Sequence, residues 1–162
     1  MTFYVSGAEV MRIAVDGTVT LVATSGLSIG RTGVTAPAAT DGNVFSGTYT
    51  PAQVSTNTNV DSVTFVSAHY MRVGNVVTVG GQITIDATTA TTDTVVRMSI
   101  PIASNFANSR ELGGVGSSFS TPYASNSITF SADTTNDCAE LRLRPSVNTS
   151  LIYNFSFTYR II

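Results

Sequence analysis

The sequence predicts an all-β fold, an antiparallel β-sandwich of the jelly-roll kind. About seven or eight short segments alternate apolar with polar residues, and turn-forming residues separate them at intervals of roughly 8–12 residues. No segment repeats its apolar residues at the period of a helix. The alternation is strongest over residues 151–162, where successive odd positions carry Leu, Tyr, Phe, Phe, Tyr and Ile. Such side chains suit one buried face of a strand, so this segment is predicted to be a central core strand.

The first part of the chain reads as a ribbon followed by a linker. Residues 2–22 form short apolar segments, and Asp16-Gly17 is a strong signal for a two-residue hairpin turn. A lone ribbon is marginally stable in water, so we expect it to pair with copies of itself in an oligomer. Residues 23–46 are rich in Gly, Ala, Thr and Ser, which is typical of an extended linker. We therefore divide the chain into an N-terminal segment, residues 1–46, and a β-sandwich head, residues 47–162.

Within the head, the strands are predicted from their alternation and from the turn residues between them. A phase slip near Phe65 and Val66 predicts a bulge, and Gly80-Gly81 predicts a kink. Residues 112–120 are rich in glycine and only weakly strand-like. Residues 101–111 are expected to be irregular. The predicted strands are residues 47–51, 62–72, 77–86, 94–100, 112–120, 127–132, 139–143 and 151–162.

Charge and cysteine content exclude several classes of function. The net charge is −2 and the pI is about 5.1, which argues against a nucleic-acid partner. Arg142 and Arg144 alternate with Leu141 and Leu143, which predicts the solvent face of a strand rather than a basic patch. The one cysteine forms no intramolecular disulfide. The chain shows neither a signal peptide nor an apolar run near the ~20 residues that span a membrane.

We find no constellation of residues that predicts an enzyme, a metal site or a cofactor. The one histidine, His69, and the one cysteine, Cys138, both lie in predicted strands, where structural roles are commoner than catalysis. Asp133 and Asp137 suit a polar turn better than a calcium site. The other acids are scattered, and Glu111 and Glu140 are expected to be solvated.

Loops are the natural place for recognition, since scaffolds present variable contacts there. The candidate contact residues, chosen because Tyr, Asn and Arg are adaptable recognition groups, are Asn105, Phe106, Arg110, Tyr123 and Asn126. The alternative is that Phe106 and Tyr123 anchor their loops in the rim of the core.

Several segments carry a resemblance to a known family. GAEVMRIAVDGTV at residues 7–19 resembles the "GxExMRI…sGNVGIG" ribbon of bacteriophage fibre and tailspike stalks, with Thr18 where that ribbon usually has Asn and Leu21-Val22 in place of its Gly-Ile-Gly ending. Four further stretches resemble the C-terminal head domain of phage fibre proteins. They are GTYTP at 47–51, YMRVGNVVTVGG at 70–81, IPIASNF at 100–106 and FSFTYRII at 155–162.

This resemblance implies a homotrimeric virion appendage made in the host cytoplasm without a signal peptide. Residues 1–46 would form a stalk remnant that meets other virion proteins, and the head would contact a host-surface glycan or protein. The ribbon residues expected at the trimer interface are Met11, Ile13 and Val15. Ser156 and Thr158, small polar residues on the outer face of the last strand, are the corresponding candidates in the head.

Two alternatives remain open. The same fold could serve a head fibre or decoration protein that is anchored on the capsid. It could also be a free carbohydrate-binding module, which predicts a monomer with a groove of exposed aromatic residues. The absence of Trp counts against that last reading.

Overall fold

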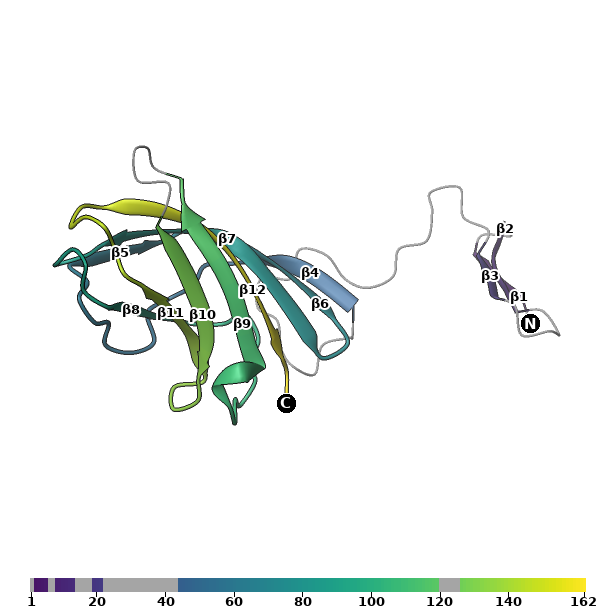
Figure 1. The fold of residues 1–162 in the computed structure, drawn as a ribbon. Coiled ribbons are helices and arrows are strands. Elements are labelled where there is room, and N and C mark those ends of the chain that lie inside the picture. The colour runs from purple at the N-terminus through teal and green to yellow at the C-terminus, as the bar shows by residue number, and fades with distance from the viewer. Residues whose placement is uncertain (1, 6–7, 14–18, 22–43, 120–125) are drawn as a thin grey trace.

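The computed structural model describes residues 2–5, 8–13, 19–21, 44–119 and 126–162 of the chain. The described strands form two separate sheets, and every strand pair in them is antiparallel. The all-β antiparallel fold is therefore confirmed (Figure 1). Among the described residues there is no helix with the length and apolar character needed to span a bilayer.

The N-terminal sheet contains three short strands in the order β1-β2-β3. They are β1 (Thr2–Val5), β2 (Ala8–Ile13) and β3 (Val19–Leu21). β2 pairs with β3 from Met11 opposite Leu21 to Ile13 opposite Val19, as the hairpin signal predicts. The turn residues Asp16 and Gly17, and the candidate interface residue Val15, lie outside the described residues.

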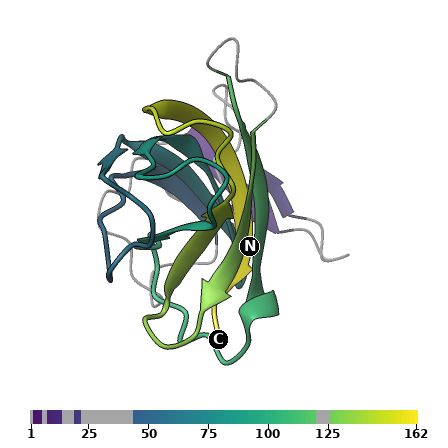
Figure 2. The ribbon, with the colours of Figure 1, turned by 60° about the vertical axis from the view of Figure 1, so that its left-hand side comes forward.

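The head is one continuous sheet of nine strands in the order β4-β6-β7-β12-β9-β10-β11-β8, with β5 pairing on β7. Seen from two directions, the sheet curls so that its two halves face each other across a shared interior (Figures 1 and 2). The sandwich-like layers thus belong to a single hydrogen-bonded sheet. Its strands are β4 (Val44–Tyr49), β5 (Ser62–Phe65), β6 (Ala68–Val73), β7 (Val76–Asp86), β8 (Thr94–Met98), β9 (Leu112–Ser118), β10 (Ser127–Asp133), β11 (Cys138–Leu143) and β12 (Leu151–Arg160).

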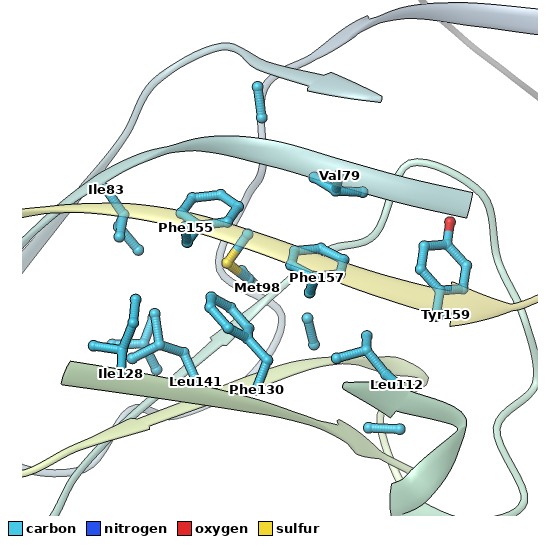
Figure 3. Close-up of a cluster of buried hydrophobic side chains, with 14 of the residues drawn as sticks. Val79, Ile83, Met98, Leu112, Ile128, Phe130, Leu141, Phe155, Phe157 and Tyr159 are labelled. Carbon is cyan, nitrogen blue, oxygen red and sulfur yellow. The ribbon is translucent and has the colours of Figure 1, made fainter. Parts of the chain in front are cut away.

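The predicted role of the last strand is confirmed, because β12 lies in mid-sheet between β7 and β9. Its odd-numbered side chains are buried, and burial of each such side chain stabilises the fold by roughly 1.5–3 kcal/mol. Phe155 and Phe157 stack with their ring centroids 5.9 Å apart. Phe130 of β10 lies close to both rings, and Figure 3 shows Leu141 and Ile128 beside Phe130. The core therefore forms where the two halves of the curled sheet meet.

β9 is a full central strand, although its sequence predicts only a weak one. Its inward positions Gly114 and Gly116 lie opposite Phe157 and Phe155 on one side, and opposite Phe130 and Ile128 on the other. With no side chain on β9 between them, the ring of Phe130 lies 5.1 Å from that of Phe157 and 5.4 Å from that of Phe155. Packing across the strand, rather than the propensity of its own residues, stabilises β9.

Three local features refine the predicted strands. The phase slip near Phe65 is a break, so residues 62–72 form two strands, β5 and β6, that both pair with β7. Gly74 has φ +61° at the first central position of the β6–β7 hairpin, which is the position of Gly in a type II′ turn. β4 begins at Val44, within the segment that the sequence assigned to the linker. The division of the chain into a stalk and a head at residue 46 stays a prediction.

The segment between β4 and β5 protects one edge of the sheet. Thr58 and Val95 exchange two backbone hydrogen bonds of 2.9 and 3.0 Å, and the N–H of Val54 donates to the carbonyl of Arg97 at 3.1 Å. These bonds occupy backbone groups of β8, the last strand of the sheet order. A covered edge cannot pair with a strand of another chain, so head-to-head contact by strand addition is disfavoured there.

Candidate functional site

Of the five predicted contact residues, Phe106 is an anchor of the core. Its side chain is 5% exposed, and its ring lies edge-on to Tyr159 at 5.8 Å between centroids. The backbone N–H of Phe106 donates to the carboxylate of Asp137 at 3.0 Å. This burial corrects the expectation that Phe106 meets a receptor and agrees with the alternative reading.

Asn126 is also structural. It is 7% exposed, its Nδ2 donates to Ser146 Oγ at 3.0 Å, and its Oδ1 accepts from the backbone N–H of Ser146 at 3.2 Å. Its carbonyl accepts from the N–H of Ser118. Because its amide is used to join two loops, the expectation that Asn126 contacts a receptor is corrected as well. Tyr123 lies outside the described residues.

Asn105 and Arg110 are exposed and remain candidate contact residues. Asn105 has φ +61°, a left-handed conformation that Asn tolerates better than most residues. Arg110 lies in the short 3-10 helix η1 (Ser109–Glu111). Hydrogen bonds from the backbone N–H groups of Asn108 and Ala107 hold the carboxylate of Glu111 and lower its pKa. This 3-10 turn presents Arg110 on a defined backbone rather than on an irregular one.

The outer face of the sheet is polar along β12. Ser156 and Thr158 are exposed, as the alternation predicts, and Thr158 Oγ1 lies 3.2 Å from Thr78 Oγ1 on β7. Two rows along the same face, beyond Gly80 and Ser156, Gln82 Nε2 donates to Asn154 Oδ1 at 3.2 Å. Between these two hydrogen-bonded pairs, the outer surface of β7 and β12 carries only uncharged polar groups and glycine.

Beside this polar surface lies an exposed cluster of large apolar side chains, Val44, Met71, Val73 and Val76, which we call the outer apolar patch. Val44 pairs with Val73, and Val73 with Val76, so the three valines form one row across β4, β6 and β7. Met71 lies two residues before Val73 on the same face. The four side chains are between 37% and 54% exposed. Clusters of exposed apolar groups mark interaction surfaces in soluble proteins.

A second feature of the outer face is an open depression of about 320 Å³ over β8, β11 and β10. These three strands are neighbours in the sheet and lie side by side in Figure 1. The inward row beneath it, Thr94, Leu143 and Ile128, is buried. Val95, Arg142 and Thr129 form one cross-strand row of the outward side chains that line the depression. The others, Asp93, Arg144 and Ser127, lie at the adjoining ends of β8, β11 and β10.

A chain of alternating charges leads to the edge of this depression. Arg97 Nε lies 2.8 Å from Asp133 Oδ2, and Arg97 Nη2 lies 2.8 Å from Glu140 Oε2. The other oxygen of Glu140 accepts from Arg142 Nε at 2.8 Å and lies 2.7 Å from Arg142 Nη2. Glu140 is therefore buried and doubly paired rather than solvated as expected. Arg97 also donates from Nη1 to the carbonyl of Thr56, so all of its nitrogens have partners.

The two arginines of the depression are held differently. The side chain of Arg142 is 60% exposed, and its ion pair with Glu140 is the last link of the charge chain. Arg144 Nε donates to the backbone carbonyl of Thr91 at 2.6 Å, and within the described part of the chain no carboxylate lies within salt-bridge distance of Arg144. Sequence reasoning placed both arginines on a solvent face correctly. It missed the depression because the lining residues on β8 and β10 are distant in sequence.

The residues considered for catalysis do not form a reactive group. His69 is exposed on β6, whereas Cys138 is fully buried on β11, where burial raises the pKa of its thiol to about 12. Partial burial raises the pKa of Asp133, but hydrogen bonds from Asn136, Thr135 and Arg97 outweigh it, so the net shift is downward. Within the described ranges, no three His, Cys, Asp or Glu side chains are grouped to hold a metal ion.

Comparison with known proteins finds little. No family model and no curated protein matches this chain. Among solved structures, the chain is similar to a reovirus attachment protein, sigma1, solved in complex with alpha-2,3-sialyllactose, at 12% identity over 99% of this chain and 95% of that chain, with a TM-score of 0.44. At this identity and score the likeness supports no statement about function.

Proposed function

We propose that this chain is a virion fibre protein, in which residues 47–162 form a head that contacts the host surface and residues 1–46 form part of a stalk. The resemblance of the sequence to bacteriophage fibre heads supports this role. The four resembling segments of the head are also neighbours in the fold: β4, β6, β7 and β12 are consecutive strands, and residues 100–106 are bound to β12 by two hydrogen bonds between Ile102 and Tyr159.

We propose that the working form is a homotrimer whose heads contact each other through the outer apolar patch and the adjoining face of β12. The observation that carries this proposal is the patch itself. Its four apolar side chains are exposed on strands, whereas their neighbours on the inner face are buried. The face between them and Ser156 carries no acidic residue, so a second copy can cover it without burying an unpaired carboxylate.

The test of this proposal is the oligomeric state of the full chain, measured by light scattering on a size-exclusion column. We expect a trimer, and Met71→Asp should shift it to monomer, since an unpaired carboxylate buried at an interface costs on the order of several kcal/mol. Val54→Asp, at an exposed apolar residue on the β4–β5 segment, is the matched control and should leave the trimer intact. A wild-type chain that stays monomeric at micromolar concentration contradicts the fibre proposal.

Location on the virion distinguishes a tail fibre from a capsid-anchored decoration protein. Electron microscopy of particles labelled at the C-terminus of this chain should place the label at a tail tip. Label distributed over the capsid would favour the decoration protein. A free monomer that binds neutral saccharides would favour the carbohydrate-binding module.

A further inference from the structure

We propose that the depression over β8, β11 and β10 binds an acidic saccharide, with its anionic group between Arg142 and Arg144; this inference rests on the fibre-head function proposed above. Arg142 lies on β11 and Arg144 directly follows the last residue of that strand, and the two side chains are exposed on the same side of the sheet, over the depression. Both line the depression. The geometry therefore brings two permanent positive charges to one concave surface.

The guanidinium groups are oriented before any ligand arrives. Glu140 holds Arg142 through Nε and Nη2, and the carbonyl of Thr91 holds Arg144 through Nε. The described residues show no further hydrogen bond from Arg142 Nη1 or from the Nη atoms of Arg144. These planar donors suit a carboxylate, phosphate or sulfate, and their existing contacts lower the entropy lost on binding.

The rest of the lining suits a sugar ring. Ser127 and Thr129 present hydroxyl groups on β10, and the carboxylate of Asp93 can accept hydrogen bonds from sugar hydroxyls. Val95 supplies an apolar surface on the β8 side. A volume of about 320 Å³ lies at the lower end of the range for small-molecule sites.

The same lining disfavours an extended polyanion. Asp93 lies in the depression, and Glu140 adjoins it as the partner of Arg142. The chain as a whole carries a net charge of −2, so a nucleic acid meets repulsion outside the two arginines. A ligand with one acidic group among neutral hydroxyls fits this arrangement, and its binding should weaken as salt concentration rises.

The test measures binding of trigalacturonic acid to the full-length chain by isothermal titration calorimetry, with neutral galactotriose and a sulfated galactotriose as parallel probes. We expect the two acidic probes to bind and the neutral one not to bind. Arg144→Gln should weaken binding by about tenfold or more, because it removes charge-assisted hydrogen bonds. Thr64→Gln, at an exposed position on β5 that does not line the depression, is the control and should leave the affinity unchanged.

A second variant, Ser127→Tyr, fills the depression without altering either arginine and should also abolish binding. Thermal melts of each variant confirm that the head is folded. Equal binding of acidic and neutral probes, no binding of any probe, or equal losses in Arg144→Gln and Thr64→Gln would overturn the inference.

The oligomeric state of the same sample separates the two proposals. A trimer that binds none of the probes leaves the fibre function in place and refutes the saccharide site. A monomer that binds acidic probes through Arg144 refutes the trimeric fibre and retains the site.

Discussion

Glycine occupies the two middle inward positions of β9, the strand that lies between β12 and β10. A Cβ at Gly114 would overlap the side chain of Phe157 and the carbonyl oxygen of Ser156. At Gly116 a Cβ would come within 2.8 Å of the side chain of Ile128. The absent side chains on β9 therefore make room for the rings of β12 and β10, and the aromatic core depends on them.

Alanine substitution should strongly destabilise the head on the inward face of β9 and change its stability little on the outward face. Gly114→Ala forces rings and backbone apart and should lower the free energy of unfolding of the head by about 3 kcal/mol, at the upper end of the usual overpacking cost. Gly113→Ala, one residue earlier, points to open space, with no atom within 4 Å of the added Cβ. Its effect should stay within about 0.5 kcal/mol. Urea denaturation followed by tyrosine fluorescence measures the free energy of unfolding of both variants. Equal losses of stability would show that backbone strain, and not packing against β12, sets the cost of the substitutions.

The thiol of Cys138 is a second residue whose environment has a measurable effect. Burial raises its pKa to about 12 in the folded head, against about 8.5 in an unfolded chain. Between these values the unfolded chain loses a proton that the folded head keeps, so unfolding becomes more favourable as pH rises. Stability should be unaffected by this thiol below about pH 8.5 and should fall between about pH 8.5 and 10.

Denaturation curves across that pH range, compared between wild type and Cys138→Ala, check this expectation. The alanine variant should show a shallower fall between about pH 8.5 and 10. The tyrosines are common to both proteins, so their titration cancels in the comparison. Identical slopes in the two proteins would mean that Cys138 titrates in the folded head as it does in the unfolded chain.

At the scale of elements, β12 connects the core to the proposed assembly surface. Its odd positions hold the aromatic cluster, and its even positions face outward beside the outer apolar patch. Thr158 lies in the same cross-strand row as Met71, through Thr78 of β7, and Ser156 lies in the next row. One strand thus serves folding with one face and, in our proposal, assembly with the other.

Ser156→Arg tests the outer face of β12 separately from the patch. The added side chain points away from the core, so the head should keep its melting temperature within a few degrees. If the heads pack through this face, the trimer should dissociate at protein concentrations where wild type remains assembled. Sedimentation velocity measures this, and Thr64→Arg, an exposed position on β5, is a suitable control. Normal trimers of Ser156→Arg would place the interface elsewhere.

At the scale of the whole molecule, one curled sheet produces both a core and two distinct outer surfaces. The half formed by β4, β6, β7 and β12 carries the outer apolar patch, and the half formed by β10, β11 and β8 carries the depression with its two arginines. Because the two features lie over different strands, assembly can cover the first without covering the second. Three copies would then present three weak sites at once, and avidity would strengthen attachment.

Alternation with a period of two determined most of the strands, because it depends only on which residues must be buried on one face. For that reason the inward face of residues 151–162 and its central position could be predicted from the sequence. The β6–β7 hairpin followed equally from Gly74 and the residues around it. The glycine strand β9 is indicated only weakly by its own residues, since its stability comes from rings on two other strands.

The tertiary structure alone decided which side chains meet across the sheet. Phe106 and Asn126 are of residue types that often contact receptors. In the fold, however, Phe106 packs on Tyr159 and bonds to Asp137, and Asn126 bonds to Ser146, so both are structural. Arg142 and Arg144 read as an ordinary solvent face, and only strand order places Asp93, Ser127 and Thr129 beside them. Period and turn signals are local properties of the chain, whereas neighbours across strands depend on pairing between distant segments. The sequence therefore specified the strands, and their pairing built the candidate site.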